Sequence, residues 1–339
     1  MRSSAFSFVG HMTPLAQITF AASNTKERWF SMSTGSSLTS LASADARILV
    51  PLDGSTRAEG ALPVAERLAQ ELHRPLLLTR IASLVPFPMA ATGAPVPAEV
   101  YQQMIDDERR AATDYLSQQA QMLQRQGLMV ETLVEEGDPA AALLSLGAAR
   151  PIGLIVMTTH GRTGLARVAV GSVAGRLVRD SHIPVLLAPS PDEQNIRVSV
   201  QSLGHILAPL DGSPLAESAL TVVRQLAGSV ARQITLLRVI AFTADDPERA
   251  EARRYLEDQA RNLQTQLEGQ GCSVSATLVE GVTPGEKIVQ FAEENNCLVV
   301  MATHGRGGLA RLALGSVADQ VTHMAHGAHI AALVVHPAG

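Results

Sequence analysis

Short uninterrupted apolar runs alternate along the chain with longer segments in which apolar residues recur every three or four positions. Such runs are typical of strands buried on both faces of a sheet, and the periodic segments are typical of amphipathic helices. The predicted strands are residues 47–51, 76–81, 129–134, 154–158 and 185–188, followed by 205–209, 234–240, 273–279, 298–302 and 332–335. Strands that alternate with helices predict a doubly wound α/β fold, with parallel strands and helices on both faces.

The helices are predicted from apolar stripes and from capping residues. In the second half of the chain one stripe consists of Leu256, Ala260, Leu263 and Leu267, and its spacing returns in the first half at Leu116, Ala120 and Leu123. Further helices are predicted at residues 139–149, 173–179, 284–294 and 317–325. Pro63 lies inside the first predicted helix, where we expect it to introduce a kink.

The chain contains the same sequence pattern twice. Residues 159–173 read THGRTGLARVAVGSV and residues 303–317 read THGRGGLARLALGSV, while ILVPLDGS at 48–55 returns as ILAPLDGS at 206–213. We therefore expect two copies of one domain. The expected organisation is a disordered N-terminal extension at 1–44, a first domain at 45–190, a linker at 191–204 and a second domain at 205–337. The first copy carries an insertion that we assign to a proline-containing loop at 83–98.

Composition restricts the partners and the compartment. The 339 residues suffice for two domains, and 46% of them are hydrophobic. Aromatic residues make up only 3%, the net charge is −5 and no long basic run occurs, so we expect neither nucleic acid nor a membrane surface as partner. No apolar stretch is long enough to span a bilayer. The two cysteines, Cys272 and Cys297, fit a reducing compartment, which predicts a cytoplasmic protein.

The repeated glycine-containing segments point to anion binding. Both copies place an Asp-Gly-Ser turn and a glycine-rich loop after predicted strands, at the edge where parallel α/β sheets bind ligands. Gly171 and Ser172 open a helix, whose free amides and dipole attract a phosphate group. Arg162 in the loop can add bidentate contacts to phosphate oxygens. The alternative is that the loop is only a structural turn between a strand and a helix.

Fast phosphoryl transfer is not expected. The chain has no Gly-Lys-Ser or Gly-Lys-Thr sequence and no dinucleotide-binding fingerprint. We assign no catalytic residue and expect at most slow hydrolysis of a bound nucleotide. Four histidines near the end, His323, His326, His329 and His336, are interpreted as surface residues rather than metal ligands.

With these motifs the chain resembles a tandem universal stress protein. Nucleotide-binding members of that family have a loop of Gly, two residues, Gly, nine residues and Gly-Ser, and both copies match its second part. The first glycine is replaced by Thr158 in one copy and by Ala302 in the other. Because alanine is smaller than threonine, we expect the second copy to bind a nucleotide at least as well as the first.

The resemblance implies a fold and a set of binding residues. Each domain should be an open five-stranded parallel sheet of order 3-2-1-4-5, and the last strands of the two domains should pair within the chain. In the first copy the implied nucleotide-binding residues are Pro51, Asp53, Ser55, Ile81, Met157, Thr158, His160, Gly161, Arg162, Gly171, Ser172 and Val173. Their counterparts in the second copy are Pro209, Asp211, Ser213, Val239, Met301, Ala302, His304, Gly305, Arg306, Gly315, Ser316 and Val317.

The resemblance also implies a role. We expect a stress-response regulator that binds ATP or another adenine nucleotide, with or without Mg²⁺, and that acts on an unidentified regulatory protein; a homodimer is left open. One alternative is a nucleotide-independent stress or scaffold protein with vestigial sites, which the residues at 158 and 302 favour. The other is a slow nucleotide hydrolase of the same fold.

Overall fold

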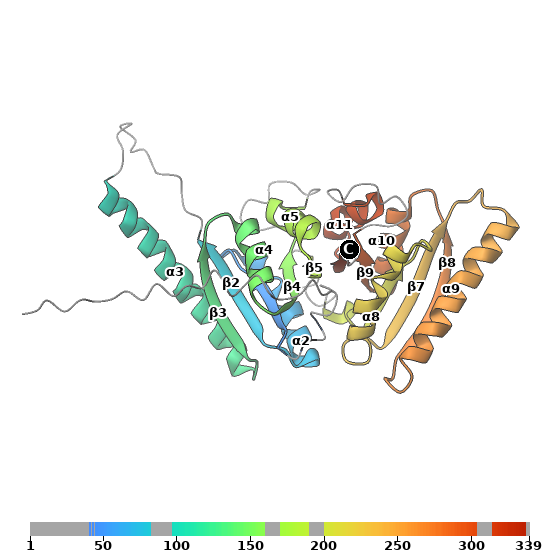
Figure 1. Cartoon of the computed structure of the whole chain (residues 1–339), viewed down its shortest axis with the longest axis horizontal. Coiled ribbons are helices and arrows are strands. Elements are labelled where there is room, and N and C mark those ends of the chain that lie inside the picture. The colour runs from blue at the N-terminus through green and yellow to red at the C-terminus, as the bar shows by residue number, and fades with distance from the viewer. Residues whose placement is uncertain are drawn as a thin grey trace, which may run out of the picture. The chain divides into compact units, whose positions relative to one another are not determined.

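The computed structural model describes residues 41, 43, 45–82, 97–159, 170–189, 200–303 and 314–336. All of them belong to one compact unit, residues 36–339 (Figure 1). The predicted N-terminal extension lies outside the described residues apart from Leu41 and Ser43, and Leu41 is buried in the core. At the end of the predicted linker, Leu203 is also fully buried in the core, so ordered packing begins before the second copy's first strand.

In the described part of the chain, ten strands form one sheet in the order β3-β2-β1-β4-β5-β10-β9-β6-β7-β8. The first five are β1 (Arg47–Pro51), β2 (Leu76–Ala82), β3 (Val130–Glu136), β4 (Ile152–Thr158) and β5 (Val185–Ala188). The second five are β6 (His205–Pro209), β7 (Gln233–Ile240), β8 (Ser273–Glu280), β9 (Leu298–Ala302) and β10 (Ala332–Val335). Neighbours within each half are parallel, whereas β5 and β10 pair antiparallel. The predicted α/β fold is confirmed, and the last strands join the halves into one sheet.

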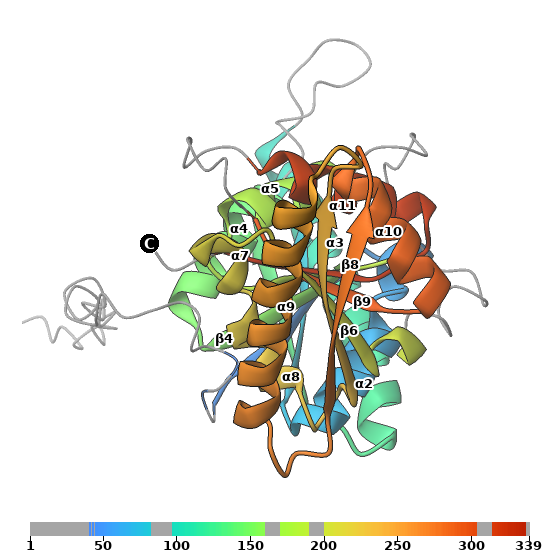
Figure 2. The same ribbon diagram turned by 90° about the vertical axis from the view of Figure 1, so that its right-hand side faces the viewer.

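Helices cover both faces of this sheet. The first half contains α1 (Thr56–Glu59), α2 (Leu62–Leu72), α3 (Ala98–Arg125), α4 (Pro139–Ala149) and α5 (Ser172–Asp180). The second half contains α7 (Pro214–Glu217), α8 (Leu220–Leu226), α9 (Asp246–Gln266), α10 (Pro284–Asn295) and α11 (Ser316–Gly327). The helices α2, α3, α8 and α9 pack on one face, and α4, α5, α10 and α11 pack on the other. Figure 2 shows α9 lying along β8.

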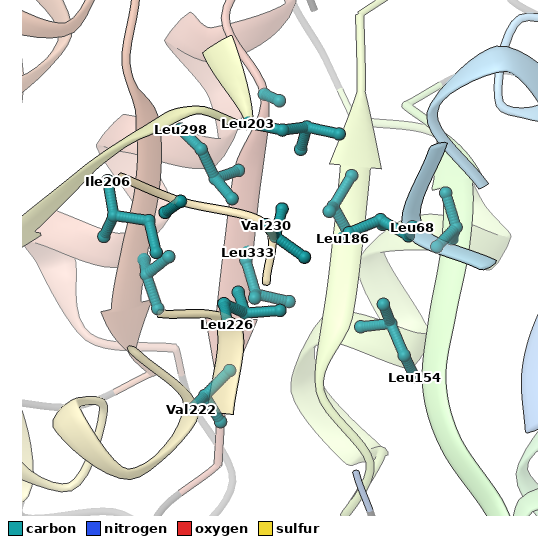
Figure 3. Packing of buried hydrophobic residues seen from close by; sticks show 14 of the residues in the cluster. Leu68, Leu154, Leu186, Leu203, Ile206, Val222, Leu226, Val230, Leu298 and Leu333 are labelled. Atoms are coloured by element: carbon teal, nitrogen blue, oxygen red, sulfur yellow. The ribbon is translucent and has the colours of Figure 1, made fainter. Parts of the chain in front are cut away.

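The two halves share hydrophobic core on both faces of the sheet, more extensively on one face than on the other. On the side of α2, α3, α8 and α9, a single cluster runs from the first half into the second, with Val230 close to Leu186 and Leu333 (Figure 3). The opposite face has one cluster in each half, and Val334 of β10 belongs to the first-half cluster. The second half therefore contributes to the core of the first on both faces.

One prediction about the first copy needs correction. Pro63 does not kink a continuous helix, because the chain forms two separate helices and Pro63 lies in the first turn of the second, α2. The second half breaks in the same way between α7 and α8, where Thr221 stands in place of the proline, so the break does not depend on it. Of the loop predicted at 83–98, the structure describes only Pro97 and Ala98, and α3 begins at Ala98.

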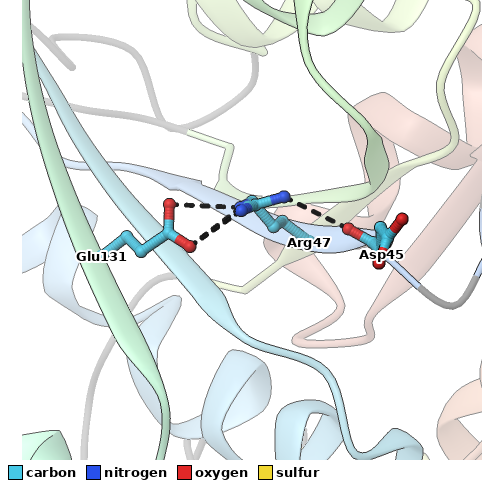
Figure 4. Close-up of polar contacts among 3 residues, drawn as sticks. All are labelled: Asp45, Arg47 and Glu131. Carbon is cyan, nitrogen blue, oxygen red and sulfur yellow. Dashed lines mark hydrogen bonds and ion pairs between the residues drawn. The ribbon is translucent and has the colours of Figure 1, made fainter.

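Polar contacts tie the first and third strands of each half together at the edge where the strands begin. In the first half Arg47 of β1 donates from Nη2 to Glu131 of β3 at 2.9 Å and from Nη1 to the Asp45 carbonyl (Figure 4). The second half uses neutral groups instead. His205 Nε2 lies 2.8 Å from Thr235 Oγ1, which lies 3.1 Å from the Ser275 hydroxyl.

Candidate functional site

A cavity of about 540 Å³ opens at the carboxyl ends of β1, β2 and β4 in the first half. The helix α3 lies on one side of it, and α4 and the start of α5 lie on the other. Eight of the twelve residues predicted for this copy line it: Pro51, Asp53, Ile81, Met157, Thr158, Gly171, Ser172 and Val173. This is the edge at which open parallel sheets bind ligands.

The Asp-Gly-Ser turn at this edge is held by its own side chains. The Asp53 Oδ1 atom accepts from the Ser55 amide at 2.9 Å and from the Ser55 hydroxyl at 2.6 Å. The Ser55 hydroxyl in turn caps α1 by accepting from the Ala58 amide at 3.2 Å. Gly54 has φ +82°, a left-handed conformation that favours glycine. The structure thus gives Ser55 a capping role and fixes one oxygen of Asp53.

The start of α5 presents backbone donors to the cavity. Gly171 is the N-cap, and no side chain among the described residues caps this helix. The first helical hydrogen bond runs from the Gly175 amide to the Gly171 carbonyl at 2.8 Å. The amides of Ser172, Val173 and Ala174 precede it and have no partner within the helix, and all three residues line the cavity. The helix dipole adds positive potential there.

The same two devices occur in the second half. The Asp211 Oδ1 atom accepts from the amide and the hydroxyl of Ser213 at 2.9 and 2.6 Å. Gly315 is the N-cap of α11 without a side-chain cap in the described part of the chain, and its amide donates to the Thr303 carbonyl at 2.8 Å. In the first half the Gly171 amide donates to the Thr159 carbonyl at 2.7 Å in the same way.

A polar cluster beside each aspartate turn was missed by the sequence analysis. The Arg80 guanidinium lies 5.6 Å from the centre of the Tyr115 ring, and the Tyr115 hydroxyl donates to Glu59 at 2.9 Å. Glu59 also accepts from Gln119 at 3.2 Å. Burial and this contact with Glu59 raise the pKa of Tyr115. Arg80 further donates to Glu108 of α3 at 2.8 Å, at the side of the cavity.

The second half repeats this cluster with corresponding residues. Arg238 lies 5.4 Å from the centre of the Tyr255 ring, and the Tyr255 hydroxyl donates to Glu217 at 2.7 Å. Burial and the contact with Glu217 raise the pKa of Tyr255. Alignment of the two copies could have identified these residues, because each has a residue of the same type at the corresponding position of the other copy.

The remaining predicted site residues fall into two groups. His160, Gly161, Arg162, His304, Gly305 and Arg306 lie outside the described residues. In the second half the structure places Pro209, Val239, Met301, Ala302, Ser316 and Val317 at the corresponding strand ends and helix start. Residues that the sequence analysis did not single out also line the first-half cavity, among them Thr79, Tyr101 and Ile105.

The described residues do not support a metal site, a reactive cysteine or a membrane-spanning helix. Within the described ranges, no three His, Cys, Asp or Glu side chains lie close enough together to hold a metal ion. Burial raises the pKa of the Cys297 thiol to about 12, so this cysteine is not an activated nucleophile. No described helix has the length and apolar composition needed to cross a membrane.

Comparison with known proteins gives the family. The family model described as "Universal stress protein family" matches residues 46–189 and again residues 203–336. The chain belongs to the universal stress protein family. Universal stress protein Rv2005c of Mycobacterium tuberculosis is 28% identical over 296 residues, which span 82% of this chain and 94% of that protein. Universal stress protein MJ0531 of Methanocaldococcus jannaschii is 29% identical over 150 residues, 44% of this chain and 84% of that protein.

A solved universal stress protein shares the fold of nearly the whole chain. The crystal structure of a universal stress protein from Archaeoglobus fulgidus superposes with a TM-score of 0.67 at 18% identity, covering 87% of this chain and all of the other. The predicted tandem arrangement is confirmed, because the family model matches twice and relatives such as Rv2005c have a similar extent.

Proposed function

We propose that this universal stress protein is a cytoplasmic stress-response regulator that binds ATP or another adenine nucleotide in the first-half cavity. The observation that carries the proposal is the start of α5, which no described side chain caps and whose first residues, Ser172, Val173 and Ala174, line a cavity of about 540 Å³. An anion at such a helix start is stabilised by about 0.3–2 kcal/mol. The cavity size suits a ligand of nucleotide dimensions.

The rest of the cavity lining suits a nucleoside. Ile81 and Met157 provide apolar surface, while Asp53 provides a carboxylate held in place by its own turn. A site with few fixed polar groups on an apolar lining is the usual design for small-molecule binding. The residues present therefore fit a ligand with an anionic tail and a flat, partly apolar head.

Binding rather than turnover is the proposed activity. The chain has no Gly-Lys-Ser or Gly-Lys-Thr sequence. In other phosphate-binding loops the lysine of that sequence holds the transferred phosphate and the hydroxyl residue holds Mg²⁺. If Mg²⁺ accompanies the nucleotide, it would neutralise phosphate charge. Asp53, whose carboxylate lines the cavity, is the residue that would hold it. The two free, buried cysteines suit the reducing cytoplasm.

Two measurements on the purified full chain test the proposal. Denaturation and extraction should release an adenine nucleotide that chromatography identifies, and calorimetric titration of emptied protein with ATP should give a saturable isotherm. A chain that carries no nucleotide and shows no heat of binding for ATP or ADP would contradict the proposal. That result would favour a nucleotide-independent scaffold protein.

A further inference from the structure

The two halves differ at the helix that follows their second strand. Tyr115 of α3 corresponds to Tyr255 of α9, so the first residue of α9, Asp246, corresponds to Asp106. The helix α3 begins earlier, at Ala98, and its first two turns have no counterpart in the second half. The additional residues of the first copy therefore include helix.

These additional turns form part of the cavity. Tyr101, Met104 and Ile105 all line it, opposite the start of α5. The Met104 side chain is 47% exposed, so it lies at the rim. An aromatic ring flanked by apolar side chains is a suitable cover for the flat face of a nucleobase, because every base presents a π-face.

A second difference lies at the floor of the cavity. Thr79 of β2 lines the cavity and is fully buried, and its hydroxyl has no hydrogen-bond partner among the described residues. A buried hydroxyl without a partner destabilises the protein until a polar group supplies one. The corresponding residue of the second half is Leu237, which is fully buried in an apolar cluster. Only the first half therefore keeps a polar group at this place.

From these two differences, and resting on the function proposed above, we propose that the first half is the base-selective site of the chain. The first two turns of α3, with Tyr101, cover the nucleobase, and Thr79 bonds to a polar atom of the ligand at the floor. The second half lacks these two groups among its described residues and offers an anionic ligand the start of α11. This assignment is opposite to the sequence-based expectation from Thr158 and Ala302.

Calorimetric titration of the full chain with three probes tests the inference: ATP, adenosine and inorganic tripolyphosphate. We expect Tyr101→Ala to weaken the binding of ATP and adenosine about tenfold and to leave tripolyphosphate unchanged. Met122→Ala, at an exposed position near the other end of α3, is the matched control and should change none of the three affinities.

A second variant keeps the inference testable if Tyr101→Ala fails to fold. Thr79→Val conserves shape, and we expect it to weaken adenosine binding several-fold. Adenosine affinity that both Tyr101→Ala and Thr79→Val leave unchanged overturns the inference, and if ATP still binds, the proposed function stands. A wild-type chain that binds neither ATP nor adenosine overturns the proposed function and the inference together.

Discussion

Leu186 of β5 and Leu333 of β10 lie directly opposite each other in the antiparallel pair that joins the two halves of the sheet. Both side chains are fully buried, and Val230 of the second half packs close to them (Figure 3). The apolar cluster that contains them runs through both halves. The two repeats therefore share a core as well as a sheet.

We predict that the shared core makes unfolding of the halves cooperative. Leu333→Ala should lower the free energy of unfolding by about 2–5 kcal/mol, the usual cost of truncating a buried leucine. Hydrogen exchange read by mass spectrometry should show reduced protection in peptides from both halves. Loss of protection confined to the second half would contradict the shared core, and Met122→Ala on exposed surface should leave exchange unchanged.

The duplicated tyrosines give a prediction with an internal control. Tyr115→Phe removes the hydroxyl that donates to Glu59 at 2.9 Å, and Tyr255→Phe removes the one that donates to Glu217 at 2.7 Å. Because each carboxylate keeps one glutamine donor, we expect each variant to lose about 1–2 kcal/mol of stability, measured by urea unfolding. A loss in only one of the two variants would show that the clusters are not equivalent.

The unpartnered hydroxyl of Thr79 predicts a stabilising substitution in the ligand-free protein. Thr79→Val should raise the free energy of unfolding by about 1 kcal/mol, because the variant no longer buries an unpaired polar group. Thr322→Val is the control, since the Thr322 hydroxyl is equally buried but donates to the Ala318 carbonyl at 2.9 Å. Destabilisation by Thr79→Val would mean that the hydroxyl has a partner in solution.

His205 predicts a pH dependence of stability. Burial lowers the pKa of His205 in the folded chain below its ordinary value of 6.5. Above that value the histidine is neutral in both states; below it the unfolded chain takes up a proton first, so stability falls as the pH drops towards the folded pKa. His205→Gln should reduce the fall in urea midpoint between about pH 8 and pH 5.5. An equal fall in the variant would assign the effect to other groups.

Much of the fold follows from local patterns in the sequence. Apolar runs predict all ten described strands to within two residues, and Ser213 before Pro214 marks a helix start that the structure contains. The helices predicted at 173–179 and 317–325 correspond to α5 and α11, and the structure shows Gly171 and Gly315 as their N-caps. These signals depend only on neighbouring residues, so they are legible without tertiary information.

The rest of the site depends on packing between distant segments. Tyr101 lines the cavity because α3 begins at Ala98 and reaches the ends of the strands, and the sequence analysis placed neither a helix start nor a site residue there. Thr79 reads as an ordinary strand residue, and its missing partner is a property of the folded interior. Neither feature has a local signal in the sequence, although the copy-to-copy change from Thr79 to Leu237 could have drawn attention to the position.

The central claim, that the start of α5 binds phosphate, is tested most directly by the ATP affinity of Ser172→Pro. Proline suits the first position of a helix, and Gly171, at φ −57° and ψ 154°, has the conformation required before proline, so only the amide and hydroxyl donors are lost. Ser316→Pro is the matched variant in the second half. We predict that Ser172→Pro weakens ATP binding about tenfold or more while adenosine affinity and stability stay unchanged. Unchanged ATP affinity in a folded Ser172→Pro chain would contradict the account.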